Sequence, residues 1–191
     1  MKKILIIIAM AAAAIFAASA AQPSRGYRGF LEVGLDAGSQ YGFRGYSQPY
    51  FYWGFSTTHG HQFNPHLFIG GGLNIEADNL YGRGMFAVYA AGRTDWRFGR
   101  VSPFGDLRIG WNMDSGGGLY FSPTIGHRFN WFRGCSFDLG IGLTLKTRQT
   151  NRYSFTELPD GTGLIAFDRY GTATECLFAL RVGIEFGKSN R

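Results

Sequence analysis

The sequence predicts an all-β protein, an eight-stranded, antiparallel, up-and-down transmembrane β-barrel. Three observations lead to this fold class. The 191-residue chain is rich in glycine (29), phenylalanine (18) and tyrosine (10), a composition typical of strands joined by turns. Apolar and polar residues alternate in successive segments, which is the pattern of strands with two different faces. These segments number eight, and closed antiparallel barrels of this kind usually have an even count.

The first residues predict a targeting segment outside the fold. Two lysines precede an uncharged apolar run over residues 4–18, and this run ends at the small-x-small sequence Ala-Ser-Ala of residues 18–20. A membrane-anchoring helix would need a longer run, so this alternative is disfavoured. We expect a cleaved signal peptide over residues 1–20 and one barrel domain over residues 21–191. No later run is long enough for a membrane-spanning helix.

Alternation places the strands near residues 27–38, 51–58, 65–77, 85–96, 102–113, 118–129, 135–149 and 174–186. One face of each strand is apolar; in the last strand it comprises Cys176, Phe178, Leu180, Val182, Ile184 and Phe186. The opposite face collects the charges. Eleven of them form a predicted interior network: Glu32, Asp36, Glu76, Arg93, Asp106, Arg108, Arg128, Asp138, Lys146, Arg181 and Glu185. Asp95 and Arg148 share this face.

Two architectures fit these strands, and they differ in which face points inward. A soluble sandwich or lipocalin-like barrel would enclose the apolar face, whereas a transmembrane barrel turns it toward lipid. Most strands reach the roughly 9–11 residues that cross a bilayer. The charged face also carries small residues suited to a narrow interior, namely Gly34, Gly70, Gly72, Gly110, Gly126, Gly140, Gly142 and Gly183. These features predict that the charges face inward.

Loop lengths orient the predicted barrel. Short connections at residues 59–64, 96–101 and 129–134 alternate with longer ones that include residues 38–50 and 150–172. Periplasmic turns are short and external loops long in outer-membrane barrels. Aromatic residues predict an inner girdle (Phe63, Trp96, Phe98, Phe129, Trp131, Phe132 and Phe186) and an outer girdle (Tyr50, Trp53, Tyr81 and Trp111).

Charge and cysteine content limit the partners. Without its first two lysines the chain has 17 Lys+Arg against 13 Asp+Glu, so the formal charge falls from +6 to +4. This excess favours anionic lipid headgroups, and no basic stripe for nucleic acid is present. The strand assignment puts Cys135 and Cys176 at opposite ends of the molecule. A disulfide needs Cα atoms within about 7 Å, so we expect none.

The segments GFLEVG (29–34), STTHGHQFNPHLFIGGG (56–72) and VSPFGDLRIGW (101–111) resemble a family of small outer-membrane β-barrel proteins of gram-negative bacteria. The resemblance covers most of the mature chain. It implies an eight-stranded, plugged barrel that the outer-membrane assembly machinery inserts, and it carries over no catalytic residue or cofactor. Many such barrels end on an aromatic residue, whereas Phe186 here precedes Gly-Lys-Ser-Asn-Arg, so the insertion signal differs in detail.

Three functional hypotheses, a metal site, an enzyme and a pore, are weighed against a purely structural role. His59, His61 and His66 are close in sequence, but no acidic or cysteine neighbour completes a metal site, so an interfacial turn is favoured. A lipid A-modifying enzyme would need a nucleophile and base at the outer rim, and the histidines, His127 included, lie at the other end. Interior charges of both signs favour mutual pairing over a pore. We therefore expect no enzyme, no metal and no cofactor.

The expected role is that of an integral, monomeric outer-membrane barrel with a plugged lumen and a structural or adhesive function. External loop 150–172 is the candidate contact with an extracellular partner, through Tyr153, Phe155, Phe167 and Tyr170; the alternative is that it is merely a protruding hairpin split by Pro159-Asp160-Gly161. A small pore or ligand-carrying porin is the second candidate function, and a lipid A-modifying enzyme the third. Because neighbouring residues of a strand face opposite sides, the sequence also predicts that Ile141→Arg, on the lipid face, destabilises more than Gly142→Ser, on the lumen face.

Overall fold

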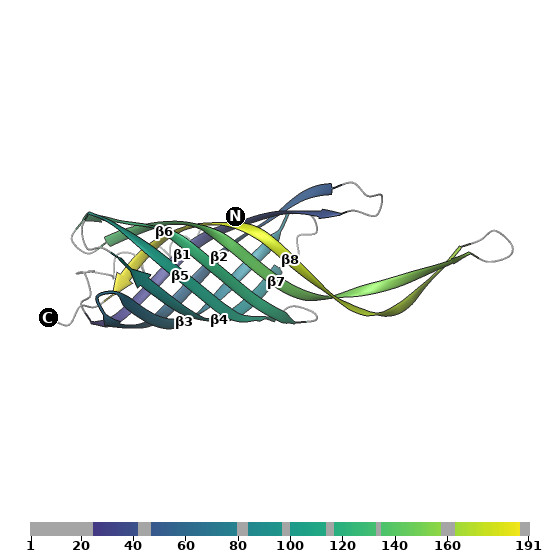
Figure 1. The fold of residues 1–191 in the computed structure, drawn as a ribbon, viewed down its shortest axis with the longest axis horizontal. Helices are drawn as coiled ribbons and strands as arrows, with labels where there is room; N and C mark the ends of the chain where they lie inside the picture. Colours follow the sequence, from purple (N-terminus) through teal and green to yellow (C-terminus); the bar gives the residue numbers. More distant parts are fainter. Residues whose placement is uncertain are drawn as a thin grey trace, which may run out of the picture.

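The computed structural model describes residues 25–41, 47–79, 84–96, 100–113, 117–132, 135–157 and 163–187. Its strands are β1 (Gly26–Tyr41), β2 (Ser47–Asn64), β3 (Leu67–Asp78), β4 (Gly84–Asp95), β5 (Val101–Asn112), β6 (Gly118–Phe132), β7 (Cys135–Glu157) and β8 (Gly163–Gly187). Each strand pairs antiparallel with the next, and β8 pairs with β1 (Figure 1). The predicted fold class, a closed eight-stranded antiparallel barrel, is therefore confirmed. Within these ranges no helix is long and apolar enough to span a membrane.

The two ends of the barrel differ. Strand β1 begins and β8 ends at one end, together with the short β2–β3, β4–β5 and β6–β7 connections; we call it the terminal end. At the other end β7 and β8 continue as a long two-stranded hairpin, which projects to the right in Figure 1. We call this the hairpin end. Five residues separate the strands at each connection of the hairpin end, and two, five and two residues separate them at the terminal end, so the connections differ less than the sequence predicts. The long connection predicted at residues 38–50 was wrong, because β1 continues to Tyr41 and β2 begins at Ser47.

Some predicted strand limits were wrong. Residues 59–64, expected as a turn, belong to β2, and the turn consists of the two residues that follow Asn64. Alternation continues through this stretch, but its outward positions include His59 and His61, which hide the apolar pattern. Strands β7 and β8 have 23 and 25 residues, so they extend well beyond the predicted limits at residues 149 and 174.

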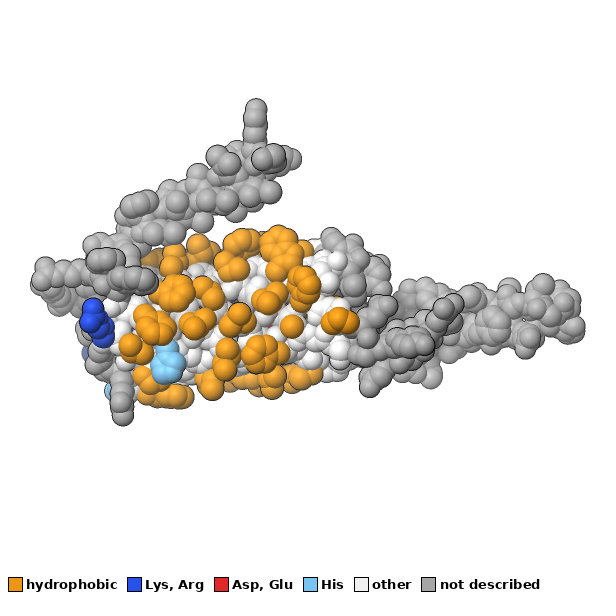
Figure 2. All heavy atoms as spheres, turned by 90° about the horizontal axis from the view of Figure 1, so that it is seen from above, with side chains coloured by type: hydrophobic (Ala, Val, Ile, Leu, Met, Phe, Trp, Pro, Cys, Tyr) orange, Lys and Arg blue, Asp and Glu red, His pale blue; other side chains and the backbone are white. Residues whose placement is uncertain are grey.

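The apolar face of the strands lies on the outside of the barrel. Ile75 is 58% exposed and Ile125 is 60% exposed, whereas their strand neighbours Glu76 and Thr124 are buried. Figure 2 shows one side of the barrel, which hydrophobic side chains cover as a band; the blue and pale-blue side chains visible on this side lie toward the terminal end. The arrangement is the inverse of a soluble protein, whose apolar side chains form the core.

Aromatic side chains are exposed at both edges of this band. Phe63 and Trp96 lie at the terminal end, and Trp53 and Trp111 lie near the hairpin end. Tyr50, predicted for the outer girdle, was placed wrongly: it is only 5% exposed and clusters with Tyr52, Met85 and Leu177 inside. Tyr50 and Tyr52 are two residues apart on β2, so their rings lie on the same, inward-pointing face. The side chains of Phe98, Trp131, Phe132 and Tyr81 lie outside the described part of the chain.

Glycines on the two faces have different surroundings. A Cβ atom added to inward-facing Gly126 would lie 2.8 Å from Gly140 Cα, and one added to Gly142 would lie 2.8 Å from Thr124 Cα. Neighbouring strands of this small barrel therefore approach too closely for a side chain at these positions. The outward-facing Gly92 is different, because its Cβ would meet no atom within 4 Å.

The strand register separates the two cysteines. Cys135 begins β7, whereas Cys176 on β8 pairs with Leu145, ten residues farther along β7. Ten residues of strand span about 34 Å, far beyond the reach of a disulfide. Cys176 is a free, exposed cysteine on the outer face.

Candidate functional site: the interior charge network

The interior charges form three layers along the barrel axis. The first, which we call the terminal layer, centres on Arg28 of β1. Its guanidinium donates to Asp95 at 2.6 Å, to Glu185 at 2.7 Å and to Gln62 at 2.7 Å. Arg128 shares Glu185 at 3.1 Å. The layer thereby connects β1, β2, β4, β6 and β8 around the barrel wall.

Arg93 completes the terminal layer. Its guanidinium contacts Asp138 of β7 at 2.5 Å and Asp95 at 3.3 Å. The guanidinium carbon also lies 3.7 Å from the ring centroid of Phe104 and 4.7 Å from that of Phe30. Arginine is suited to such a place because its planar cation can pair with carboxylates and stack on aromatic faces at once.

The central layer joins opposite walls. Arg108 on β5 pairs with Glu32 on β1, and it contacts Asp106 at 2.8 Å. Ser56 on β2 donates to Glu32 at 3.1 Å and accepts from Arg108 at 3.2 Å. Strands β1 and β5 stand four positions apart in a ring of eight, so this ion pair crosses the full width of the lumen.

A third layer, the hairpin-side layer, again joins opposite walls, at a different depth. Lys146 on β7 pairs with Glu76 on β3, again four strands away, and reaches Asp36 at 3.3 Å. Asp36 in turn pairs with Arg181 at 3.0 Å, and Arg181 donates to Thr144 at 3.1 Å. Two diametric ion pairs therefore traverse the lumen at different depths.

Aromatic side chains occupy the spaces between these layers. Tyr89 bonds to Thr58 at 2.8 Å, and its ring centroid lies 5.9 Å from that of Tyr120. The rings of Phe30 and Phe68 pack edge to face at 5.1 Å. Buried aromatic rings thus pack beside the enclosed charges. Removing one partner from such an enclosed pair is costly, because the other charge stays buried without compensation.

All eleven residues of the predicted network are buried, and each takes part in at least one ion pair. The network was underestimated at its terminal end, where Arg28 is a main hub. The signal was present, since Arg28 has the same parity as Glu32 and Asp36, but it lies at the very start of a strand. Asp95 joins the network as well, and the side chain of Arg148 lies outside what the structure describes.

The clustered histidines do not converge on one point. The Nδ1 atom of His59 lies 2.6 Å from the Tyr27 hydroxyl, and its Nε2 atom lies 2.7 Å from Thr57 Oγ1. His61 packs against the ring of Phe63, and His66 Nδ1 lies 2.7 Å from the Asp95 carbonyl oxygen. Each imidazole has its own partner on the outer rim. Among the described residues no group of three potential metal ligands occurs.

The segment predicted as external loop 150–172 is largely a β-hairpin. Its ladder continues from the pair Arg148–Ala173 to the pair Glu157–Gly163, with an irregularity between Arg152 and Tyr153. Pairing of β7 with β6 reaches only Lys146, and pairing of β8 with β1 reaches only Phe178. Leu119 of β6 still donates its backbone N–H to Thr147 Oγ1 at 2.6 Å, and beyond this point the ladder of the described residues joins β7 and β8 only to each other.

The four candidate contact residues belong to this hairpin. The register places Tyr153 opposite Phe167, and it pairs Tyr170 with Asn151 and Phe155 with Ile165. Their side chains lie outside the described part of the structure, as does the turn at Pro159-Asp160-Gly161. The backbone register nevertheless brings aromatic positions from both arms together.

Comparisons with known proteins support the fold. The structure is similar to the crystal structure of Neisserial surface protein A (NspA), with a TM-score of 0.55. The alignment covers 85% of this chain and 96% of the other, at 12% sequence identity. Such low identity shows a common fold alone. No protein-family model matches the sequence, and neither does any curated protein.

Proposed function

We propose that this chain is an integral, monomeric outer-membrane β-barrel of a gram-negative bacterium, exported through the signal peptide 1–20 and inserted by the outer-membrane assembly machinery. The apolar outer band and the buried charges support membrane insertion. In water the band would be a very large exposed apolar surface, whereas lipid satisfies it. Closure of the ladder also satisfies the backbone groups that an open sheet would leave unpaired in lipid.

Membrane insertion is tested by extracting the mature protein from membranes and comparing gel migration before and after boiling. An inserted, closed barrel is expected to stay folded in detergent and to change its migration on heating. A protein recovered from the soluble periplasmic fraction, with no such change, would contradict the proposal. That result would favour the lipocalin-like alternative.

The lumen is proposed to be plugged, and the diametric pairs Arg108–Glu32 and Lys146–Glu76 carry this proposal. An ion crossing the barrel would have to break both buried pairs and to pass the packed tyrosines between them. Planar-bilayer recordings of the purified protein are expected to show no regular conductance steps. Reproducible steps, abolished by heat denaturation, would establish the pore alternative instead.

The role we propose is an interaction at the cell surface through the β7–β8 hairpin. The observation that carries it is the ladder that continues about ten residues beyond both neighbouring strands. At about 3.4 Å per residue the hairpin extends roughly 34 Å past the barrel. Outer strand edges without a ladder partner can accept a strand from another chain, which is a common mode of peptide recognition.

The adhesive role is tested with a variant in which residues 149–172 are replaced by a short Asn-Gly turn. We expect bacteria that carry this variant to lose binding to immobilised extracellular-matrix proteins, or to lose self-aggregation, relative to the wild type. Surface display and heat-modified migration serve as controls, because the truncation leaves the barrel strands in place. Equal adhesion at equal surface display would contradict an adhesive hairpin.

A further inference from the structure

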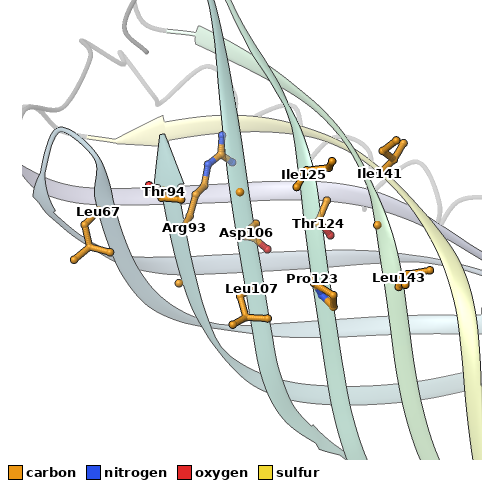
Figure 3. Close-up of a pocket in the computed structure, with 13 residues that line it drawn as sticks. Leu67, Arg93, Thr94, Asp106, Leu107, Pro123, Thr124, Ile125, Ile141 and Leu143 are labelled. Atoms are coloured by element: carbon orange, nitrogen blue, oxygen red, sulfur yellow. The ribbon is translucent and has the colours of Figure 1, made fainter. Parts of the chain in front are cut away.

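The outer wall of the barrel has a hollow on one side. Its volume is about 670 Å³, which is within the range of about 300–1,000 Å³ common for ligand sites. Figure 3 shows its apolar lining, which comprises Leu67, Leu107, Pro123, Ile125, Ile141 and Leu143 from β3, β5, β6 and β7. The floor is formed by Gly92 and Gly105, where the wall lacks side chains.

A second hollow of about 470 Å³ lies nearer the terminal end. Its lining is Arg100, Val101, Phe129, Asn130, Phe137 and Leu139. The two hollows follow one another along β7, because Leu139 of the second is the next outward-facing residue to Ile141 of the first. The exposed His127 pairs with Leu139 in the ladder and so lies between them.

We call the two hollows together the groove, and along β7 they span the length of one membrane leaflet. From Phe137 to Leu143 the strand advances six residues, or about 20 Å. A tilt of about 40° reduces this distance to about 15 Å along the membrane normal, half of a hydrocarbon core of about 30 Å. The groove therefore extends from the interface at the terminal end to the middle of the membrane.

A cation is positioned at the interfacial end of the groove. Among the side chains that the structure describes, the exposed charged ones are Arg25 and Arg100, and both lie at the terminal end. Arg100 belongs to the groove, and its carbonyl oxygen accepts a hydrogen bond from the Asn130 backbone at 3.0 Å. Arg25 precedes β1, on the opposite side of the barrel from β5, so it provides a matched reference.

We propose that this groove binds one anionic glycerophospholipid of the leaflet at the terminal end. One acyl chain lies over Gly92 and Gly105, and the phosphate lies beside Arg100, with His127 and Asn130 next to the glycerol region. In a bilayer an apolar hollow of this size fills with hydrocarbon, and the cation at its end selects an anionic headgroup. The inference rests on the proposed membrane-spanning barrel.

Trp96 provides an internal reporter of occupancy. Its ring carbon Cζ2 would lie 3.4 Å from a Cβ added at Gly105, so the indole borders the hollow. The sequence has four tryptophans, and replacing Trp53, Trp111 and Trp131 by Phe leaves Trp96 alone. Its fluorescence is measured in phosphatidylcholine vesicles that contain phosphatidylglycerol, with bromine on the chains of either lipid in turn. Preferential quenching by brominated phosphatidylglycerol is the expected result.

Two matched pairs of variants separate a built site from general lipid contact. Arg100→Gln should lower the preference for phosphatidylglycerol about five-fold, the effect expected for one cation near the membrane surface, whereas Arg25→Gln should not. Gly92→Leu fills the hollow and should lower quenching by both brominated lipids. Gly71→Leu, on the same face but outside the lining, should not.

Equal quenching by the two brominated lipids, or equal effects of the paired variants, would overturn the lipid site and leave the barrel proposal intact. To show that each variant folds, every variant is first tested for heat-modified migration. Loss of that migration in the parent protein would overturn both proposals, so the two failures are distinguishable. Because Gly92 and Arg100 both face outward and make no ion pair in the lumen, the variants are expected to fold.

Discussion

The outward and inward side chains of strand β7 have opposite environments, although they are neighbours in the sequence. Outward, Leu139, Ile141 and Leu143 are exposed, and lipid would contact them in the proposed membrane barrel. Inward, Asp138 and Lys146 are buried and meet partners on β4 and β3, across the lumen. The outer face therefore demands only apolar character, whereas the inner face demands specific partners. Substitutions on the two faces should differ in mechanism as well as in size.

The largest effect is expected from Lys146→Met. This change keeps most of the side-chain volume but leaves Glu76 and Asp36 without their shared cation, and it removes the ammonium 4.3 Å from the Tyr52 ring centroid. Breaking a buried pair typically lowers the free energy of unfolding by about 3–5 kcal/mol. The free energy of unfolding of the variant and of the wild type is measured by urea unfolding in lipid vesicles.

A second substitution gives the control for this prediction. The double variant Lys146→Met/Glu76→Gln also replaces the Glu76 carboxylate, which has lost its cation, so part of the lost stability should return. A double variant that is as unstable as the sum of two single variants would show that the ion pair itself contributes little.

Ile141→Arg sharpens the comparison from the outer face. A charge at the middle of the lipid-facing wall should lower the free energy of unfolding by about 2–4 kcal/mol. The matched variant Phe137→Arg, near the terminal end of the same strand and face, should lower it by only about 0–1 kcal/mol. Equal losses at the two depths would mean that this face does not contact lipid.

Glycine substitutions give a smaller effect with a clear contrast. The sequence predicts that Gly142→Ser is milder than Ile141→Arg, and the structure shows why it still has an effect: the Pro123 carbonyl oxygen and Thr124 Cα lie where the new Cβ would be. Overpacking of this kind lowers stability by about 1–3 kcal/mol. Gly92→Ser on the outer face has open space, so its effect should be smaller. Unfolding of the two variants under the same conditions compares them directly.

The smallest effect on folding is expected from shortening the hairpin between residues 149 and 172. Beyond Lys146 and Phe178 these strands pair only with each other, so the barrel ladder does not depend on them. Exposed segments of this type tolerate truncation. The truncated barrel should unfold at nearly the same urea concentration as the wild type. A large loss would show that the hairpin supports the barrel wall.

Local alternation predicted most of the fold. It assigned eight strands, the outward face and all eleven interior charges, because a strand repeats every two residues and each parity has one environment. It failed where the apolar signal was weak. His59 and His61 occupy outward positions of β2, and the arms of the β7–β8 hairpin carry many polar residues that look like a loop.

Partner choice in the lumen could not be derived in this way. Parity shows that Arg108 and Glu32 face inward, but their sequence positions do not reveal that β5 and β1 stand opposite each other at that depth. The same holds for the hub at Arg28, whose three partners come from β2, β4 and β8.

The sequence by itself thus determined the strands, their two faces and the inside-out distribution of charge, since these depend only on residue type at a period of two. The tertiary structure alone decided which charges pair across the lumen, where Gly92 and Gly105 leave a hollow, and how far β7 and β8 continue beyond their neighbours. These features depend on ring closure and strand register, which bring together residues far apart in the chain.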